Sequence, residues 1–190
     1  TRDGKAFELL GQKLAGLHLA QMDFNTAYAG EDLSTHIDRG FWQRCAYYKT
    51  FIHGDLHLGN IFYAPEAEEI TLIDIETMGY SVDQKHSIMR DIEAVIFRYF
   101  LYENGFDAEI PDLEEIYSVC ITSFLKAYIN AYPSQMQEDL KTYLCTMLTD
   151  HRVTSQITPP FKYILPKLNA ANLERFNDII LNIKENLRDS

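Results

Sequence analysis

The chain has few cysteines and no long apolar run, and each shortage argues against a class of protein. Its 190 residues include only 3 cysteines, Cys45, Cys120 and Cys145. Their wide spacing suits neither a disulfide framework nor a zinc knuckle. We therefore expect reduced, buried thiols in a cytoplasmic protein. No apolar run approaches the length of a membrane span and no signal peptide opens the chain, so we expect no membrane partner.

Basic side chains are also scarce relative to acidic ones. The chain has 17 Lys and Arg against 28 Asp and Glu, which gives a net charge of −11. This balance argues against a nucleic-acid partner, because phosphate binding needs basic patches. It suits a cationic small substrate, although solubility alone explains the same acidity. The hydrophobic content of 46% is ample for the core of one domain, or of one part of a larger protein.

Hydrophobic periodicity predicts mostly helices, with one β-rich segment in the first half. The expected helices cover residues 5–22, 86–103, 112–131, 135–149 and 171–187. Strand-like runs occupy 51–52, 61–63 and 70–75, and the polar residues 65–69 would close a hairpin. We expect the 70–75 strand to be buried, with Asp74 at or just past its end. The predicted fold class is α+β, mostly helical, because a doubly wound sheet needs more strands.

Two carboxylates and an amide in the β-rich segment suggest phosphoryl transfer. Asp55 lies on a turn after the first strand, where its carboxylate could orient the proton of an attacking hydroxyl. Asn60 follows five residues later, and Asp74 lies on the neighbouring strand. Their oxygens are the hard ligands that Mg²⁺ prefers. Gly54 and Gly59 permit the tight turns that such a loop requires.

The run His53-Gly-Asp-Leu-His-Leu-Gly-Asn-Ile61, followed by Leu72-Ile-Asp-Ile-Glu76, resembles motifs of the aminoglycoside phosphotransferase and choline kinase family. That family has the protein-kinase-like fold. The opening helix, Leu9-Leu-Gly-Gln-Lys-Leu-Ala-Gly-Leu-His18, is similar to the family's as well. The resemblance covers residues 7 to about 100 and implies an ATP- and Mg²⁺-dependent kinase acting on a small-molecule hydroxyl, such as an aminoglycoside, amino alcohol or sugar.

The same resemblance implies roles for individual residues. Asp55 would be the catalytic aspartate, and His53 would belong with it as the residue that braces its loop. Asn60 and Asp74 would bind the metal. Together with His57 they would form the cofactor site for ATP, in which His57 would pack the loop or lie near the phosphates. Asp91, in Arg90-Asp-Ile-Glu-Ala94, would be a structural anchor.

The chain departs from the family pattern before residue 50, where neither a Gly-rich turn nor the family's strand lysine and helix glutamate occur. We therefore expect residues 1–190 to form the C-terminal catalytic lobe, with the N-terminal, ATP-covering lobe not present in this chain. A catalytically inactive kinase-like binding module is the alternative.

Two other interpretations of the motif remain open. His53, Asp55 and His57 could ligate a transition metal. Gly54-Asp-Leu-His57 also looks like a metallophosphoesterase element, but the Asn-His pair which that family needs is missing.

The remaining histidines, His18 among them, lack partners at ligand spacing and are interpreted as ordinary. Side chains that could line a substrate groove are Tyr143, Asp150, His151, Phe161 and Tyr163, although core packing would explain them equally well.

Overall fold

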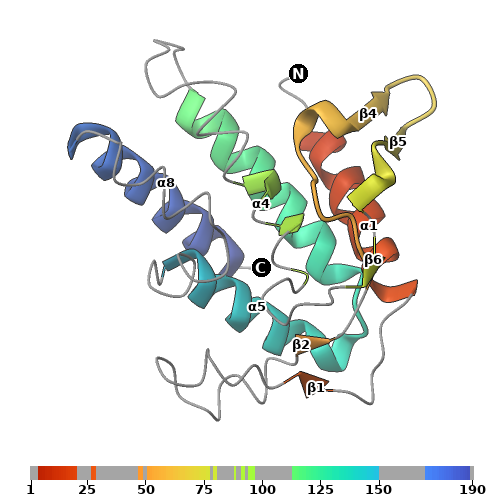
Figure 1. Cartoon of the computed structure of the whole chain (residues 1–190). Coiled ribbons are helices and arrows are strands. Elements are labelled where there is room, and N and C mark those ends of the chain that lie inside the picture. Colours follow the sequence, from red (N-terminus) through yellow and green to blue (C-terminus); the bar gives the residue numbers. More distant parts are fainter. Residues whose placement is uncertain are drawn as a thin grey trace.

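The computed structural model describes residues 4–20, 27–28, 47–48, 51–77, 79–80, 88, 91–92, 94–96, 113–149 and 170–188. Most of these residues are helical: α1 is Gly4–Ala20, α4 is Leu113–Asn130, α5 is Ser134–Thr149 and α8 is Ala170–Arg188. Short antiparallel strand pairs make up the β part. The α+β, mostly helical architecture predicted from periodicity is confirmed at this level (Figure 1).

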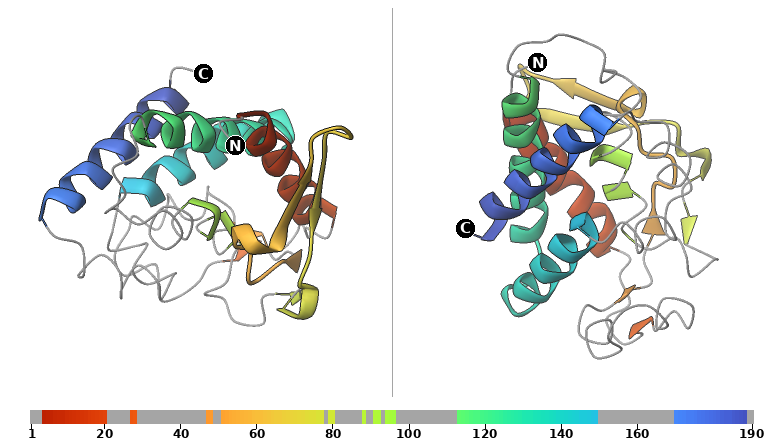
Figure 2. Two further views of the ribbon diagram at one scale, coloured as in Figure 1. Left: turned by 90° about the horizontal axis from the view of Figure 1, so that it is seen from above. Right: turned by 90° about the vertical axis from the view of Figure 1, so that its left-hand side faces the viewer.

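Helix α4 is the centre of the helical layer. It packs against α1 on one side and against α8 on the other, and α5 contacts both α4 and α8 (Figures 1 and 2). The crossing of α1 and α4 is very close at Gly11, where a Cβ atom would lie 2.3 Å from the carbonyl oxygen of Phe124. Only glycine therefore fits at this position.

Large aromatic and aliphatic side chains from these helices form one core. The largest fully buried ones include Tyr117, Phe124, Tyr128 and Phe176. Tyr143, considered as a groove residue, is also part of this core, because α5 turns it toward α8 and α4. Of the two explanations offered for Tyr143, core packing is therefore the one that the structure supports, and the other four candidates for the groove lie outside the described residues.

The helices bury one face each, at the spacing of an α-helix. On α8 the stripe through Phe176, Ile180, Ile183 and Leu187 is buried. On α1 the buried residues are Leu10, Gly11, Leu14, Ala15 and His18, whereas Phe7 and Leu17 are only partly buried. The small residues are buried because α4 approaches this side of the helix.

Two antiparallel ladders carry the β part. Strand β3 (Phe51–Ile52) pairs with β6 (Gly79–Tyr80), and β4 (Ile61–Ala64) pairs with β5 (Glu69–Leu72). A separate pair joins β1 (Ala27–Tyr28) to β2 (Tyr47–Tyr48). The β4–β5 hairpin turns at residues 65–68, as the polar run predicted, and β5 contacts α1.

The expectation that the 70–75 segment is a buried strand is wrong in two respects. The strand ends at Leu72, and within it only Ile70 is buried. The reason is that the hairpin places one face on α1 and leaves the other open. Asp74 therefore lies in a connecting segment just beyond the strand.

The structure describes residues 88, 91–92 and 94–96 of the expected 86–103 helix. Ile88, Ile92, Val95 and Ile96 are buried in the common core, and residues 91–92 and 94–96 are helical. Cys120 and Cys145 are buried and not disulfide-bonded, as expected, while Cys45 lies outside the described residues. In the described part of the chain, no helix combines the length and the apolarity that a membrane crossing would require.

Candidate functional site

The two β ladders bring the two motif-bearing segments together. Residues 53–60 connect β3 to β4, and the segment after Leu72 leads from β5 to β6. Because β3 pairs with β6 and β4 pairs with β5, both segments run between the same two ladders. A direct bond joins them where the backbone N–H of Ile73 donates to the carbonyl of Asn60, 3.0 Å apart. The segments carrying Asp55, Asn60 and Asp74 are thus held side by side.

Asn60 closes the loop that carries Asp55. Gly54 opens this loop with φ at 86°, a conformation that favours glycine. A short 3₁₀ turn, Leu58–Asn60, then brings the chain back, and the Asn60 Nδ2 group donates to the carbonyl of Asp55 at 3.0 Å. This bond fixes the amide plane of Asn60 and leaves Oδ1, the atom a cation would bind, without a hydrogen bond to the described residues.

Asp74 has an unusual backbone conformation at the point where the second segment leaves β5. Its φ is 57°, in the left-handed region, which is uncommon for a residue other than glycine although Asp and Asn tolerate it best. The residue is exposed, and a 3₁₀ turn, Ile75–Thr77, follows it. Non-glycine residues in this region of backbone conformation concentrate at functional sites. Asp74, which the motif predicts as a metal ligand, therefore also has a backbone conformation typical of such sites.

His53 links the two segments through its ring. The side chain is buried, and its Nε2–H donates to the carbonyl of Ile73 at 2.8 Å. The ring is therefore used to hold the Asp55 loop against the segment of Asp74. This placement agrees with the expected bracing role of His53 and gives it no direct access to a substrate.

Asp91 anchors the start of the same loop through its buried carboxylate. One carboxylate oxygen accepts the backbone N–H of His53 at 2.7 Å and the other accepts that of Gly54 at 2.8 Å. The carboxyl group is fully buried. Burial raises the pKa of Asp91, but the hydrogen bond and charge of His18 and the two backbone amides outweigh burial and leave that pKa below its usual value. The anchoring role expected for Asp91 is confirmed by these bonds.

His57 faces the carboxylate of Asp55. Its Nδ1 accepts the backbone N–H of Gly59 at 3.1 Å, which places the proton of the neutral ring on Nε2. That Nε2 atom lies 4.0 Å from Oδ2 of Asp55, and both side chains are about one-third exposed. His57 can thus present its Nε2–H group near the carboxylate of Asp55.

A transition-metal site built from His53, Asp55 and His57 is not formed. Across the residues that the structure describes, no group of three His, Cys, Asp or Glu side chains is placed to hold a metal ion. The ring of His53 is directed to the Ile73 carbonyl, whereas that of His57 lies beside Asp55. The arrangement leaves Asn60 and Asp74, a pair of hard oxygen donors, as the candidate ligands.

His18 was interpreted as ordinary, and this interpretation is wrong. Its Nε2 lies 3.1 Å from Asp91 and its Nδ1 lies 2.7 Å from the Tyr128 hydroxyl, with all three side chains fully buried. One signal was present in the sequence: His18 follows Leu14 and Gly11 at helical spacing, which places it on the buried face of α1. A buried histidine needs polar partners, but the sequence did not show which ones.

The open face of the hairpin carries exposed apolar side chains beside Asn60 and Asp74. Phe62 is 58% exposed and Ile73 is 38% exposed. The register pairs Ile61 with Leu72, so Phe62 and Ile73 are diagonal neighbours on the face opposite α1. Strand β4 alternates partly buried and exposed side chains, but its sequence Ile-Phe-Tyr-Ala has no alternation of apolar and polar residues that could have identified this face.

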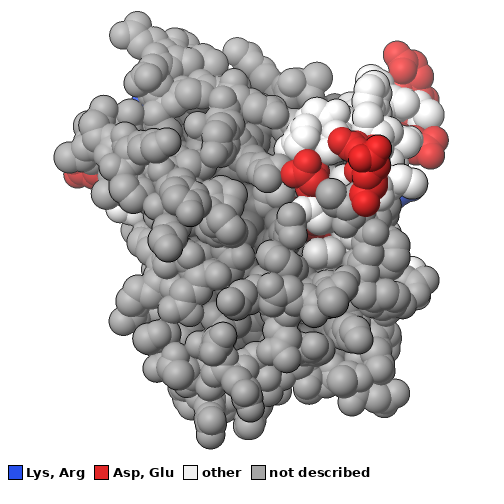
Figure 3. All heavy atoms as spheres, in the orientation of Figure 1, with Lys and Arg blue, Asp and Glu red and all other residues white. Residues whose placement is uncertain are grey.

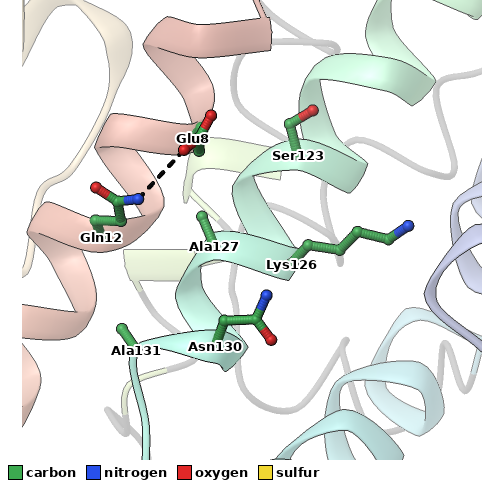
Figure 4. Close-up of a pocket in the computed structure, with 7 residues that line it drawn as sticks. All are labelled: Glu8, Gln12, Ser123, Lys126, Ala127, Asn130 and Ala131. Atoms are coloured by element: carbon green, nitrogen blue, oxygen red, sulfur yellow. Dashed lines mark hydrogen bonds between the residues drawn. The ribbon is translucent and has the colours of Figure 1, made fainter. Parts of the chain in front are cut away.

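A separate groove lies between α1 and α4. It has a volume of about 530 Å³ and is lined by Glu8, Gln12, Ser123, Lys126, Ala127, Asn130 and Ala131 (Figure 4). Two of its lining residues, Ala127 and Ala131, have small side chains. None of the predicted site residues lines it, so we regard it as a consequence of the helix crossing.

No family model matches the chain, and neither a curated protein nor a solved structure resembles it significantly.

Proposed function

We propose that this chain carries the catalytic residues of an ATP- and Mg²⁺-dependent phosphotransferase that transfers the γ-phosphate to a hydroxyl group of a small molecule. The observation that supports this most directly is the backbone bond between the two motif segments, together with the side-chain bond that closes the first segment. Asn60 donates to Asp55 through its side chain and accepts from Ile73 through its carbonyl. A base, an amide ligand and a carboxylate ligand are the protein groups that phosphoryl transfer needs.

The donor set fits Mg²⁺ better than a softer metal. Asn60 would contribute Oδ1 and Asp74 a carboxylate, and Mg²⁺ is commonly held by one or two such ligands together with the phosphates of its nucleotide. The exposure of Asp74 leaves room for that nucleotide. When bound, the ion would neutralise charge that develops on the transferred phosphate.

Asp55 is the group placed to act on the substrate. As a partly exposed carboxylate at the mouth of a braced loop, it would accept a hydrogen bond from the attacking hydroxyl and orient its oxygen toward the γ-phosphate. His57, whose Nε2 lies 4.0 Å from Oδ2 of Asp55, would border this carboxylate on one side. His53 and Asp91 would hold the loop in place and would not contact the substrate.

The exposed face formed by Phe62 and Ile73 supports nucleotide binding. Both side chains lie next to the candidate metal ligands in the strand register, and a planar base would cover apolar area there that otherwise faces water. Adenine fits this requirement as the base of the ATP that the motif implies.

Acidic side chains at the hairpin turn favour a cationic acceptor. Glu66, Glu68 and Glu69 are exposed, and acidic groups gather over this part of the described surface (Figure 3). Such a field would attract an amine-bearing alcohol. Aminoglycosides and amino alcohols are therefore the acceptors to test first, with neutral sugars for comparison.

The proposal is tested by titrating Mg·ATP into the chain by calorimetry. We expect Mg²⁺-dependent binding that is lost in Asp74→Asn, since asparagine tolerates the same backbone conformation but removes the charge. Asp178→Asn, a change at an exposed position of α8, is the control and should bind normally. Absence of any Mg²⁺-dependent heat in the unaltered protein would reject the proposal in favour of the inactive binding module.

A second variant separates binding from catalysis. Asp55→Asn should retain Mg·ATP binding but lower the rate of phosphate transfer roughly 10²- to 10⁴-fold, the usual contribution of a general base. Transfer is measured as ADP release with each class of alcohol. Equal rates for Asp55→Asn and the unaltered protein would remove Asp55 from the proposed mechanism.

A further inference from the structure

A pair of tyrosines extends the hydrogen bonds of the candidate site into the helical core. The Tyr128 hydroxyl lies 2.7 Å from His18 Nδ1 and 2.6 Å from the hydroxyl of Tyr132. Tyr128 is on α4, and Tyr132 lies just beyond the end of that helix. Both tyrosines are buried. A continuous chain of bonds therefore runs from Tyr132 through Tyr128, His18 and Asp91 to the backbone of the Asp55 loop.

The donors and acceptors along this chain have one consistent order when His18 is neutral. Asp91 is an anion and can only accept, so the Nε2 atom of His18 must carry the proton that it donates. The Nδ1 atom is then an acceptor, and the Tyr128 hydroxyl must donate to it. The Tyr128 oxygen in turn accepts from Tyr132.

The order reverses in part when His18 is charged. Nδ1 then donates to the Tyr128 oxygen, and Tyr128 donates to Tyr132. A hydroxyl group serves in both states because it can donate and accept. Burial raises the pKa of Tyr128 well above its ordinary value, and Tyr132 and Asp91 add to this effect, so the hydroxyl keeps its proton.

We propose that Tyr128 and Tyr132 are positioning residues for the Asp55 loop. They hold the ring of His18 in the orientation that bonds Asp91, and Asp91 in turn holds the amides of His53 and Gly54. Those two residues immediately precede Asp55. The consequence for catalysis rests on the proposed function, whereas the consequence for the His18 ring and the loop amides does not.

The physical reason is that the Tyr128 hydroxyl forms a hydrogen bond with Nδ1 of His18 in a fully buried environment. Tyr128→Phe keeps the aromatic ring but removes the hydroxyl, and with it this buried hydrogen bond to Nδ1. The loss of a buried hydrogen bond is unfavourable, so the ring should turn or shift. Its bond to Asp91 and the support of the loop amides should then weaken.

The first experiment measures the network itself by NMR on the full chain. In Tyr128→Phe we expect the ¹⁵N resonance of His18 Nδ1 to shift, because this atom loses its hydrogen bond to the hydroxyl. Hydrogen exchange of the His53 and Gly54 amides should become roughly tenfold faster or more. Unchanged His18 resonances and unchanged exchange would overturn the proposal, whether or not the protein has enzymatic activity.

Tyr117→Phe is the matched control, because this buried tyrosine is on the same helix and donates to the carbonyl of Ile96, away from the chain of bonds. It should lower stability without altering the His18 signals. Tyr132→Phe, which leaves the Tyr128–His18 contact in place, should shift the same signals by a smaller amount. This variant also keeps the proposal testable if Tyr128→Phe does not fold.

The second experiment follows phosphate transfer. Tyr128→Phe should lower kcat roughly 10- to 100-fold, because small displacements of a catalytic group are costly, while KM for ATP stays close to its original value. Tyr117→Phe should leave kcat unchanged. Shifted His18 resonances and faster amide exchange with an unaltered kcat would overturn the link to Asp55. If the unaltered protein has no transferase activity but the NMR changes occur, the proposed function fails and the positioning of the loop stands.

Discussion

Replacing Gly11 by alanine tests the close crossing of α1 and α4, on which the buried part of the site depends. An alanine Cβ would lie 2.3 Å from the Phe124 carbonyl oxygen and 3.0 Å from the Tyr128 nitrogen. Both are backbone atoms and cannot rotate away. To reach an ordinary contact distance, the two helices must separate by about 1 Å.

The expected loss of stability follows from two opposing terms. Overpacking of a core typically costs about 1–3 kcal/mol, and the upper end applies here because the neighbour is backbone. Alanine is a better helix former than glycine by about 1 kcal/mol, which offsets part of the cost. We expect a net loss of about 2 kcal/mol, or a fall in Tm of roughly 4–8 °C for a domain of this size.

Gly16→Ala is the matched control on the same helix. Gly16 is exposed, and a Cβ there would have no atom within 4 Å. The substitution should therefore raise stability by up to about 1 kcal/mol through helix propensity alone. Both variants are measured by urea unfolding followed by circular dichroism. If Gly11→Ala is as stable as Gly16→Ala, the close approach of the two helices is refuted.

Two further predictions concern the loop anchor and the open face of the hairpin. The pKa of Asp91 is lowered by folding, so its contribution to stability is present above the ordinary aspartate pKa of about 4 and is lost as the pH falls below that value. Asp91→Asn should lower stability at pH 7 and make stability less dependent on acid pH, as measured by unfolding at a series of pH values. An equally steep loss of stability in acid for this variant would count against the prediction. Phe62→Ser should weaken Mg·ATP binding roughly tenfold through lost apolar contact, and it should leave Tm nearly unchanged because Phe62 is largely exposed. The control in the calorimetric titration is Leu181→Ser, because Leu181 of α8 is also exposed, at 51%. Equal binding by the two variants would remove Phe62 from the nucleotide surface.

The local parts of this structure could be read from the sequence. The ends of α4, α5 and α8 lie within a residue or two of the predicted ones, because their apolar periodicity and the proline before α5 are strong signals. The association of Asp55 with Asn60 was also accessible, since five residues and two glycines confine the loop. Geometry that depends on residues close together in the sequence is the easiest to predict from it.

The buried half of the site could not be found in this way. His18 and Asp91 are 73 positions apart, and His18 and Tyr128 are 110 apart. Periodicity predicts that each helix has a buried face but does not say which residues meet across it. The same limit explains the error at the 70–75 segment, where a run of apolar residues was taken for a buried strand although only one side of the hairpin is covered.

The burial of Asp91 has a cost that the loop itself explains. A carboxylate removed from water is unfavourable, and a buried ion pair is weak evidence for a gain in stability over apolar residues of the same size. The turn at Gly54, however, directs two successive amides, those of His53 and Gly54, into the protein interior. Apolar replacements would leave both donors without acceptors, whereas one carboxylate satisfies both and retains an oxygen for His18. The conformation of the Asp55 loop therefore explains why Asp91 is buried as a charged group. Residues that stabilise the Asp91 carboxylate, such as His18, thereby stabilise the loop that Asp91 holds.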